Sequence, residues 1–99
     1  MKIESRLAQI GSQNDPQTGA VSFPVYQSTA FRHPRLGQST GFDYSRSKSP
    51  TRAVLEAAAA DLESGDAGFA TSSGMAALQI VSALFSHGDH LLVSLDLYG

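Results

Sequence analysis

The sequence predicts an α/β fold, and three observations carry that prediction. An alanine-rich segment between Ser49 and Gly65 has apolar residues at helical spacing. A short apolar run at 67–71 breaks at small polar residues and restarts as a second helical pattern. A further apolar run at 91–95 is typical of a buried strand. Helix, strand, helix and strand in this order indicate a sheet whose faces are covered by helices.

The first 49 residues are expected to form an arm rather than part of the sheet. Apolar residues recur at helical spacing from Ile3 to Ile10, which predicts a short amphipathic helix. Pro24 argues against an internal strand in the weakly alternating stretch around it. Residues 27–49 have no sustained period, and so long an irregular segment is uncommon inside a compact domain. We therefore expect an arm that packs on another subunit, or a functional loop.

Residues 50–99 are expected to begin a separate and regular domain. Ser49 is a suitable N-cap, Pro50 suits the first helical position, and Gly65 is a suitable C-terminal stop. Four consecutive alanines favour a helix and allow close packing. The apolar positions that recur at helical spacing are Val54, Leu55, Ala58 and Leu62.

The second helix is expected to begin at a cap on Ser72 or Ser73 and to end near Gly88. Its expected apolar face consists of Met75, Leu78, Val81 and Phe85. The run at 91–95 then forms the next strand. A buried strand of this kind needs neighbours on both sides and layers on both faces. The 99 residues are therefore expected to be the N-terminal part of a longer protein.

The composition argues against several classes of protein. A formal net charge of -2 gives no reason to expect nucleic acid or an anionic membrane as a partner. The sequence has no cysteine, so disulfides and thiolate metal sites are excluded. No apolar run approaches the roughly 20 residues that span a bilayer, and charges interrupt the stretch where a signal peptide would be apolar. We expect a soluble cytoplasmic protein.

A candidate anion site lies at Ser73-Gly74-Met75, where the second helix begins. The first N–H groups of a helix lack partners, and the helix dipole adds partial positive charge there. Glycine leaves room for a ligand, so the N–H groups of Gly74 and Met75 would point at it. The spacing matches neither a nucleotide P-loop nor a dinucleotide fingerprint. By itself the motif favours the alternative, a capped helix that binds nothing.

Three side chains could complete a site for a small aromatic phosphate. Arg46 offers a planar fork that suits a phosphate dianion, and Tyr44, two residues away in an extended arm, adds an O–H donor on the same side. Tyr98 follows a buried strand, where ligands of open α/β sheets gather, and its ring could lie flat against an aromatic ligand. The alternatives are a surface arginine, a half-buried tyrosine and ordinary aromatic packing.

The remaining polar residues give weaker signals. Arg52 lies in the first turn of a helix, which disfavours a cation, and is expected to be solvated or ion-paired. His87 and His90 are separated by a turn and share no helix face, so no metal site is expected. His33 is expected to be solvated rather than catalytic. No serine has a base at a recognisable spacing.

Several motifs occur together in a fixed order. They are Tyr44-Ser-Arg46-Ser-Lys-Ser-Pro50-Thr-Arg52, Leu62-Glu-Ser-Gly65, Ser72-Ser-Gly74-Met-Ala-Ala77, Gly88-Asp89 and Asp96-Leu-Tyr98-Gly99. In order and spacing the sequence resembles the cysteine/methionine-metabolism family of pyridoxal-phosphate (PLP) enzymes. Within it, stretches such as Leu7-Ala-Gln-Ile-Gly11 look most like the cystathionine γ-synthase/O-acetylhomoserine sulfhydrylase type.

The resemblance implies a fold, a cofactor and roles for the candidate residues. It implies the aspartate-aminotransferase-like fold, PLP-dependent transferase fold type I, of which residues 50–99 would begin the large PLP-binding domain. It implies a homotetramer built from tight dimers, with residues 1–49 reaching the neighbouring subunit's active site. There Tyr44 and Arg46 would bind the PLP phosphate, while the backbone at Gly74 and Met75 would bind the subunit's own cofactor. Tyr98 would stack on the pyridine ring and take part in proton transfer.

The sequence departs from the family pattern in two ways. Ser49 stands where the family usually has asparagine, which keeps an N-cap type. The catalytic lysine and the aspartate that pairs with the pyridinium nitrogen lie downstream in the family. The two lysines of this sequence, Lys2 and Lys48, match the catalytic lysine neither in motif nor in position. The fragment itself is therefore expected to be inactive.

The resemblance leaves the reaction open. The expected function is γ-replacement on an O-acyl-homoserine with cysteine or sulfide, in methionine biosynthesis. Cystathionine β- or γ-lyase and methionine γ-lyase share nearly every functional position here. An alternative of another class is a non-enzymatic interaction module that is complete at this length.

Overall fold

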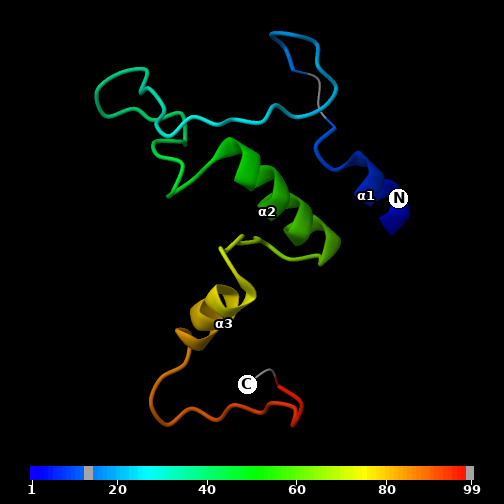
Figure 1. Cartoon of the computed structure of the whole chain (residues 1–99), viewed down its shortest axis with the longest axis vertical. Helices are drawn as coiled ribbons and strands as arrows, with labels where there is room; N and C mark the ends of the chain where they lie inside the picture. Colours follow the sequence, from blue (N-terminus) through cyan, green and yellow to red (C-terminus); the bar gives the residue numbers. More distant parts are fainter. Residues whose placement is uncertain (13–14, 98–99) are drawn as a thin grey trace.

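Three helices make up the regular structure of the described residues, 1–12 and 15–97, in this computed structural model. They are α1 (Ile3–Gln9), α2 (Pro50–Leu62) and α3 (Gly74–Ser82), and they follow one another along an open path (Figure 1). The radius of gyration is 17.7 Å, against about 13 Å for a compact domain of 100 residues. No described side chain is fully buried. None of the described helices is both long and apolar enough to span a bilayer.

The arm runs back along α2 and is attached to it by polar contacts. Helix α1, which the apolar spacing predicted, lies against α2, and the Arg6 guanidinium forms an ion pair with Asp61 at 2.7 Å. Further along, the Tyr26 N–H donates to the Thr51 hydroxyl at 2.9 Å. The groove between arm and helix has a volume of about 490 Å³. Its lining is apolar and includes Phe23, Tyr26, Phe31, Phe42 and Val54.

Helix α2 begins where the sequence predicted and ends by a different device. Ser49 is the N-cap residue with Pro50 at the first position, but the serine side chain makes no capping hydrogen bond. At the other end, Ser64 and not Gly65 takes the left-handed conformation, with a φ of 55°. The Gly65 N–H then donates to the Ala60 carbonyl at 2.8 Å. This is the Schellman arrangement, with the glycine one position after the left-handed residue.

Helix α3 confirms one of the two predicted caps and is shorter than expected. The Ser73 hydroxyl accepts a hydrogen bond from the Ala76 N–H at 3.1 Å. The helix ends at Ser82 rather than near Gly88. Beyond it the Leu84 N–H donates to the Val81 carbonyl, three residues back, at 3.1 Å. Tighter bonds of this kind are common where an α-helix ends.

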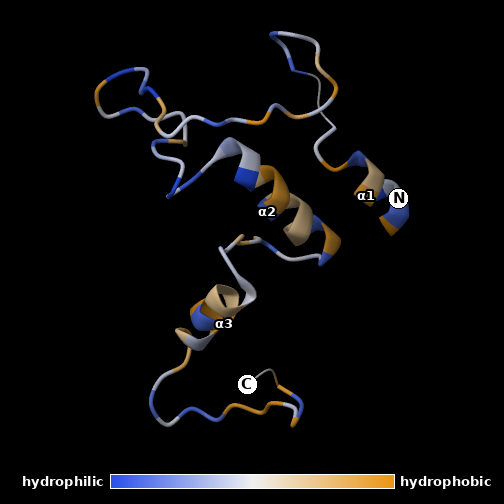
Figure 2. Cartoon of the chain, viewed as in Figure 1, coloured by the Kyte–Doolittle hydropathy of each residue, from blue (hydrophilic) through white to orange (hydrophobic). Residues whose placement is uncertain are grey.

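The two predicted strands do not form in the described part of the chain. Residues 67–71 pack on α2, and 91–95 run alone past the end of α3 (Figures 1 and 2). Leu92 and Leu95 are fully exposed, at 102% and 104%. A strand is held by ladder hydrogen bonds to a neighbour, and no such neighbour lies beside either segment. Within residues 1–12 and 15–97, pairing is limited to isolated bridges in the arm, at Ser12–Ser22, Ala30–Tyr44 and Arg35–Gln38.

Candidate functional site

Tyr44 and Arg46 lie together, as predicted, but in a turn rather than an extended segment. The N–H groups of Ser47 and Lys48 both donate to the Tyr44 carbonyl at 3.0 Å, which closes the turn 44–47. The Arg46 Nη2 donates to the Tyr44 hydroxyl at 3.3 Å. The guanidinium carbon lies 4.9 Å from the centre of the tyrosine ring, a cation–π contact.

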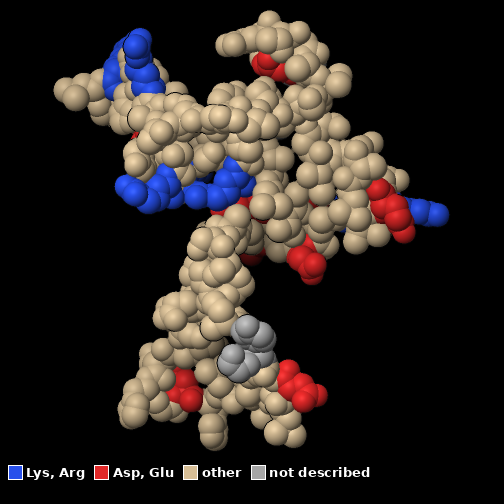
Figure 3. Space-filling view, in the orientation of Figure 1, with Lys and Arg blue, Asp and Glu red and all other residues tan. Residues whose placement is uncertain are grey.

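The charge of Arg46 has no acidic partner among the described residues. The ion pairs there join Arg6 to Asp61 and Arg52 to Glu56, and the remaining close contact of this kind lies between His33 and Asp43. Lys and Arg atoms gather around the turn that leads into α2 (Figure 3). An exposed guanidinium beside a phenol can offer charge-assisted hydrogen bonds to a phosphate.

A short antiparallel contact holds the loop that ends at Tyr44. The Phe31 N–H donates to the Asp43 carbonyl at 3.0 Å, and the Ser45 N–H donates to the Thr29 carbonyl at 2.8 Å. The rings of Phe31 and Phe42 pack with their centres 5.9 Å apart. The base of the loop is therefore fixed from both sides, immediately before the turn.

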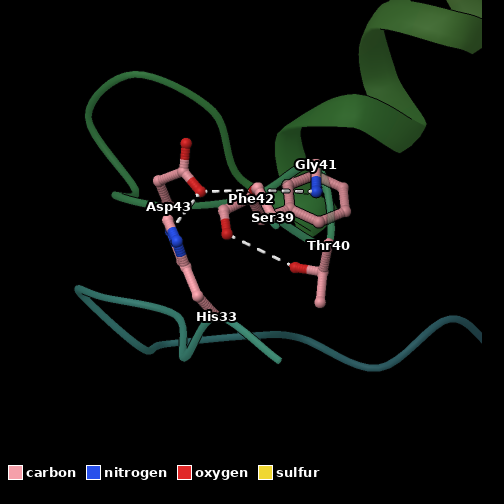
Figure 4. Close-up of polar contacts among 6 residues, drawn as sticks. All are labelled: His33, Ser39, Thr40, Gly41, Phe42 and Asp43. Carbon is pink, nitrogen blue, oxygen red and sulfur yellow. Dashed lines mark hydrogen bonds and ion pairs between the residues drawn. The ribbon is translucent and has the colours of Figure 1, made fainter. Parts of the chain in front are cut away.

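Asp43 collects the polar contacts inside this loop (Figure 4). Its Oδ1 lies 2.8 Å from Nε2 of His33 and accepts a hydrogen bond from the Ser39 hydroxyl. The Ser39 hydroxyl in turn accepts from the Gly41 N–H at 3.0 Å. The Ser39 hydrogen bond, helped by His33 and opposed by desolvation, holds the pKa of Asp43 below its ordinary value. His33, expected to be solvated, keeps about half of its side chain exposed, at 47%, and also contacts Asp43, which the sequence did not predict.

The start of α3 has the open backbone that the sequence predicted. A Cβ placed on Gly74 would have no atom within 4 Å, so there is open space beside this turn in the described part of the chain. The Ser73 hydroxyl occupies the Ala76 N–H. Within the described residues, the N–H groups of Gly74 and Met75 make no hydrogen bond and remain available.

The structure therefore forms two partial sites. Tyr44 pairs with Arg46, and Gly74 stands beside Met75, but no hydrogen bond, ion pair or cation–π contact joins these pairs in the described part. Tyr98, the predicted stacking and catalytic residue, lies outside the described residues. Both partial sites fit a phosphate, because one offers an unpaired guanidinium and the other offers unused N–H donors.

A network that the sequence analysis missed lies between the partial sites. Arg52, expected to be solvated or ion-paired, pairs with Glu56 at 3.3 Å and donates to the Arg46 carbonyl at 3.3 Å. It also donates to the Ser47 carbonyl. The same Glu56 oxygen accepts a hydrogen bond from the Ala70 N–H at 3.1 Å. The separation of four residues between Arg52 and Glu56 is a recognised signal for a helical ion pair.

Residues suited to a metal ion do not gather in the described part of the chain. No group of three His, Asp or Glu side chains there could hold a metal. His87 and His90 lie in the turn after α3, where the Asp89 side chain accepts from the Ser86 N–H at 2.7 Å. The carboxylate of Asp89 is therefore used to cap this turn.

Similar solved structures define the class of protein. Cystathionine γ-lyase from Lactobacillus plantarum, complexed with L-serine, gives a TM-score of 0.77 and is 49% identical, covering 91% of this chain and 23% of that one. Cystathionine γ-synthase from Xanthomonas oryzae, in complex with aminoacrylate and cysteine, gives 0.78 at 35% identity, covering 84% and 21%. The chain thus corresponds to the N-terminal part of PLP-dependent fold type I, the α/β fold that was predicted.

The sequence comparisons narrow this class to one family. Residues 4–99 match the Cys/Met metabolism PLP-dependent enzyme family, and the chain belongs to it. The cystathionine γ-synthase/O-acetylhomoserine (thiol)-lyase of Bacillus subtilis is 59% identical over 98% of this chain, and the cystathionine γ-synthase of Haemophilus influenzae is 56% identical over the same share. The chain spans 26% of the length of each. The predicted family and its cofactor, PLP, are confirmed.

Proposed function

We propose that the chain is the N-terminal part of a PLP-dependent trans-sulfuration enzyme that acts on an O-acyl-homoserine. The enzyme would replace the acyl group with cysteine or sulfide, a step of methionine biosynthesis. The observation that carries the proposal is the order of similarity. Identity is 59% and 56% with two synthases, against 48% with the cystathionine γ-lyase of B. subtilis and 46% with a β-lyase of Lactococcus lactis.

The candidate residues would divide the binding of the cofactor between two subunits. Arg46 would donate to the phosphate with its guanidinium and Tyr44 with its hydroxyl, in the active site of a neighbouring subunit. The exposure of the pair, and the fact that Arg46 has no acidic partner among the described residues, support this role. The N–H groups of Gly74 and Met75 would bind the phosphate of the subunit's own cofactor, supported by the open space at Gly74.

The substrate chemistry needs residues that these 99 positions do not supply. PLP, when bound, supplies an electron sink for charge that develops on the substrate α-carbon. Tyr98 would stack on its ring and help to move the proton at the substrate amine. The lysine that holds the cofactor covalently would come from further along the chain, so this segment alone would be inactive.

The assembly follows from the same proposal. Residues 1–49 would form the arm that contacts the neighbouring subunit, and residues 50–99 would begin the large PLP-binding domain. Because each site would then need residues of two chains, the enzyme would be at least a dimer, and we propose a cytoplasmic homotetramer. The alternative of a non-enzymatic module loses support, because nearly the whole chain matches an enzyme family.

A lyase of the same family is the second candidate. The Lactobacillus plantarum γ-lyase supports it, since its structure is 49% identical where the Xanthomonas oryzae synthase is 35% identical. The two activities separate in one assay of the full-length protein with PLP. Formation of cystathionine from an O-acyl-homoserine and cysteine is the expected result. Release of a 2-oxo acid and ammonia from cystathionine, without synthesis, would replace the synthase by the lyase.

A further inference from the structure

Two charged side chains on one face of α2, Arg52 and Glu56, contact the turn that carries one partial site and the segment that precedes the other. Arg52 reaches back to the turn that carries Tyr44 and Arg46. Glu56, one helical turn later, reaches forward to the segment that leads into α3. The ion pair between them, 3.3 Å from Nε to Oε1, connects the contacts of Arg52 with the turn to the contact of Glu56 with the segment before α3.

Arg52 holds the turn by its main-chain carbonyls. Its Nη1 donates to the Arg46 carbonyl at 3.3 Å, and its Nη2 donates to the Ser47 carbonyl. Both nitrogens belong to one planar guanidinium, so the two carbonyls are fixed relative to each other. The contacts leave the Arg46 side chain free to face a ligand.

Glu56 contacts the segment that precedes α3. Its Oε1 accepts from the Ala70 N–H at 3.1 Å, three residues before the Ser73 cap. A second contact fixes the same segment, because Gly68 lies flat on the helix there. A Cβ at Gly68 would come within 2.3 Å of the Glu56 carbonyl oxygen.

Helix stability alone does not explain an arginine at position 52. The residue lies in the first turn of α2, where the helix dipole disfavours a cation. Its side chain is 30% exposed and that of Glu56 is 21% exposed, so the pair is partly shielded from water. The buried Nε of Arg52 makes no well-directed hydrogen bond in the described part, so its attraction to the carboxylate is ionic. The directed bonds go to the turn.

We infer that Arg52 and Glu56 are positioning residues that fix the Tyr44–Arg46 turn and the start of α3 against α2. Neither side chain needs to touch the cofactor. Since the turn would serve a neighbouring subunit and α3 its own, the pair links the two half-sites that one chain contributes. The inference rests on the proposed function, which gives both half-sites a phosphate.

The test uses the full-length protein and measures the dissociation constant of PLP alongside the unfolding temperature of the cofactor-free form. Arg52→Ala is expected to weaken PLP binding roughly tenfold, the size typical of lost support at a distance. Glu56→Gln keeps an oxygen for the Ala70 N–H but loses the charge, so a smaller loss is expected. If Arg52→Ala does not fold, Arg52→Lys replaces it, since an ammonium keeps the charge but lacks the planar fork that fixes the two carbonyls relative to each other.

Arg6→Ala is the matched control. Arg6 also pairs with a carboxylate of α2, at 2.7 Å, and its side chain is 29% exposed. It should lower the unfolding temperature as much as Arg52→Ala and leave PLP affinity unchanged. Equal losses of affinity in the two variants would overturn the inference, because they would reflect general stability.

A double variant separates positioning from direct binding. If Arg52 acts through the turn, Arg46→Ala together with Arg52→Ala should weaken PLP binding by less than the sum of the two single losses, although Tyr44 and the start of α3 would still depend on Arg52. Independent losses that add would overturn the inference. Loss with Arg46→Ala but none with either Arg52 variant would overturn it and leave the proposed function standing. Unchanged affinity in Arg46→Ala would instead overturn the phosphate role itself.

Discussion

The chain up to residue 71 and the chain from α3 onward are built differently. In the first region, side chains and main-chain groups distant in sequence find one another, as in Arg6–Asp61, Tyr26–Thr51 and Ala70–Glu56. From α3 onward, the described polar contacts join residues at most four apart. The apolar side chains there lie open, with Leu92 and Leu95 fully exposed. Figure 2 shows orange, hydrophobic stretches along this part of the chain.

The difference reflects what each kind of sequence needs. The arm is rich in turns and polar groups, so it can satisfy its backbone by contacts with α2 and with itself. The later segment carries the apolar pattern of a sheet layer, which is stable only between neighbours. Such a large exposed apolar surface marks an interaction site in a soluble protein. We expect the full-length protein to cover it.

The largest effect is expected at the ligand-facing end of the first region. Arg46→Ala in the full-length protein should weaken PLP binding by about 1.5–3 kcal/mol, the range for a hydrogen bond to a charged group. A titration of the cofactor-free protein with PLP measures this. Arg35→Ala, an exposed arginine of the same loop, is the control and should bind normally. Unchanged PLP affinity in Arg46→Ala would contradict the proposed role of the arm in binding the cofactor.

Gly68 is closely packed and Gly74 lies beside open space, so alanine substitutions at the two positions should have different effects on stability. Gly68→Ala should lower the free energy of unfolding by about 1–3 kcal/mol, since its Cβ would meet the Glu56 carbonyl oxygen at 2.3 Å. Gly74→Ala meets no atom within 4 Å and should leave stability unchanged, while crowding the phosphate and weakening PLP binding. Denaturant unfolding and PLP titration measure the pair. Equal stability of both variants would contradict the packing of 67–71 on α2.

Local signals predicted the helices, while the strands depend on partners that the sequence pattern does not name. The caps at Ser49 and Ser73 and the proline at position 50 act within one turn, so they could be read directly. The run at 91–95 has the right residues for a strand, yet a strand exists only beside another. The apolar pattern therefore predicts that the segment forms a strand when a neighbouring strand is present, and it does not predict the conformation without one.

The candidate site divides in the same way. Tyr44 and Arg46 were predicted to meet because they are close in sequence, although a turn rather than an extended arm brings them together. The pairing of His33 with Asp43 was missed, since it depends on how the loop between them folds back. Arg52 and Glu56 could have been found from their helical spacing, but their bonds to Arg46 and Ala70 could not.

The two helix caps allow a smaller test. Ser73→Ala should destabilise by about 1 kcal/mol, because its hydroxyl accepts from the Ala76 N–H at 3.1 Å. Ser49→Ala removes a side chain that makes no capping hydrogen bond, so it should lower the free energy of unfolding by only a few tenths of about 1 kcal/mol. Thermal unfolding of the full-length variants compares them. A larger loss at Ser49 would show that the caps differ from those described.

The smallest effect concerns pH and the loop before the turn. The pKa of Asp43 lies below its ordinary value, so its contacts stabilise the folded loop above the unfolded pKa of about 3.9. That contribution is lost as the pH falls through the lowered folded pKa. An NMR titration should place the carboxyl midpoint below that of an unfolded peptide. Ser39→Ala should raise it, and an unshifted midpoint in the unaltered protein would contradict the contact.

The decisive experiment is a crystal structure of the full-length protein with PLP. We expect the cofactor phosphate to be bound by the N–H groups of Gly74 and Met75 from one subunit and by Tyr44 and Arg46 from its neighbour. A phosphate held without Arg46, with that guanidinium directed into solvent, would contradict it.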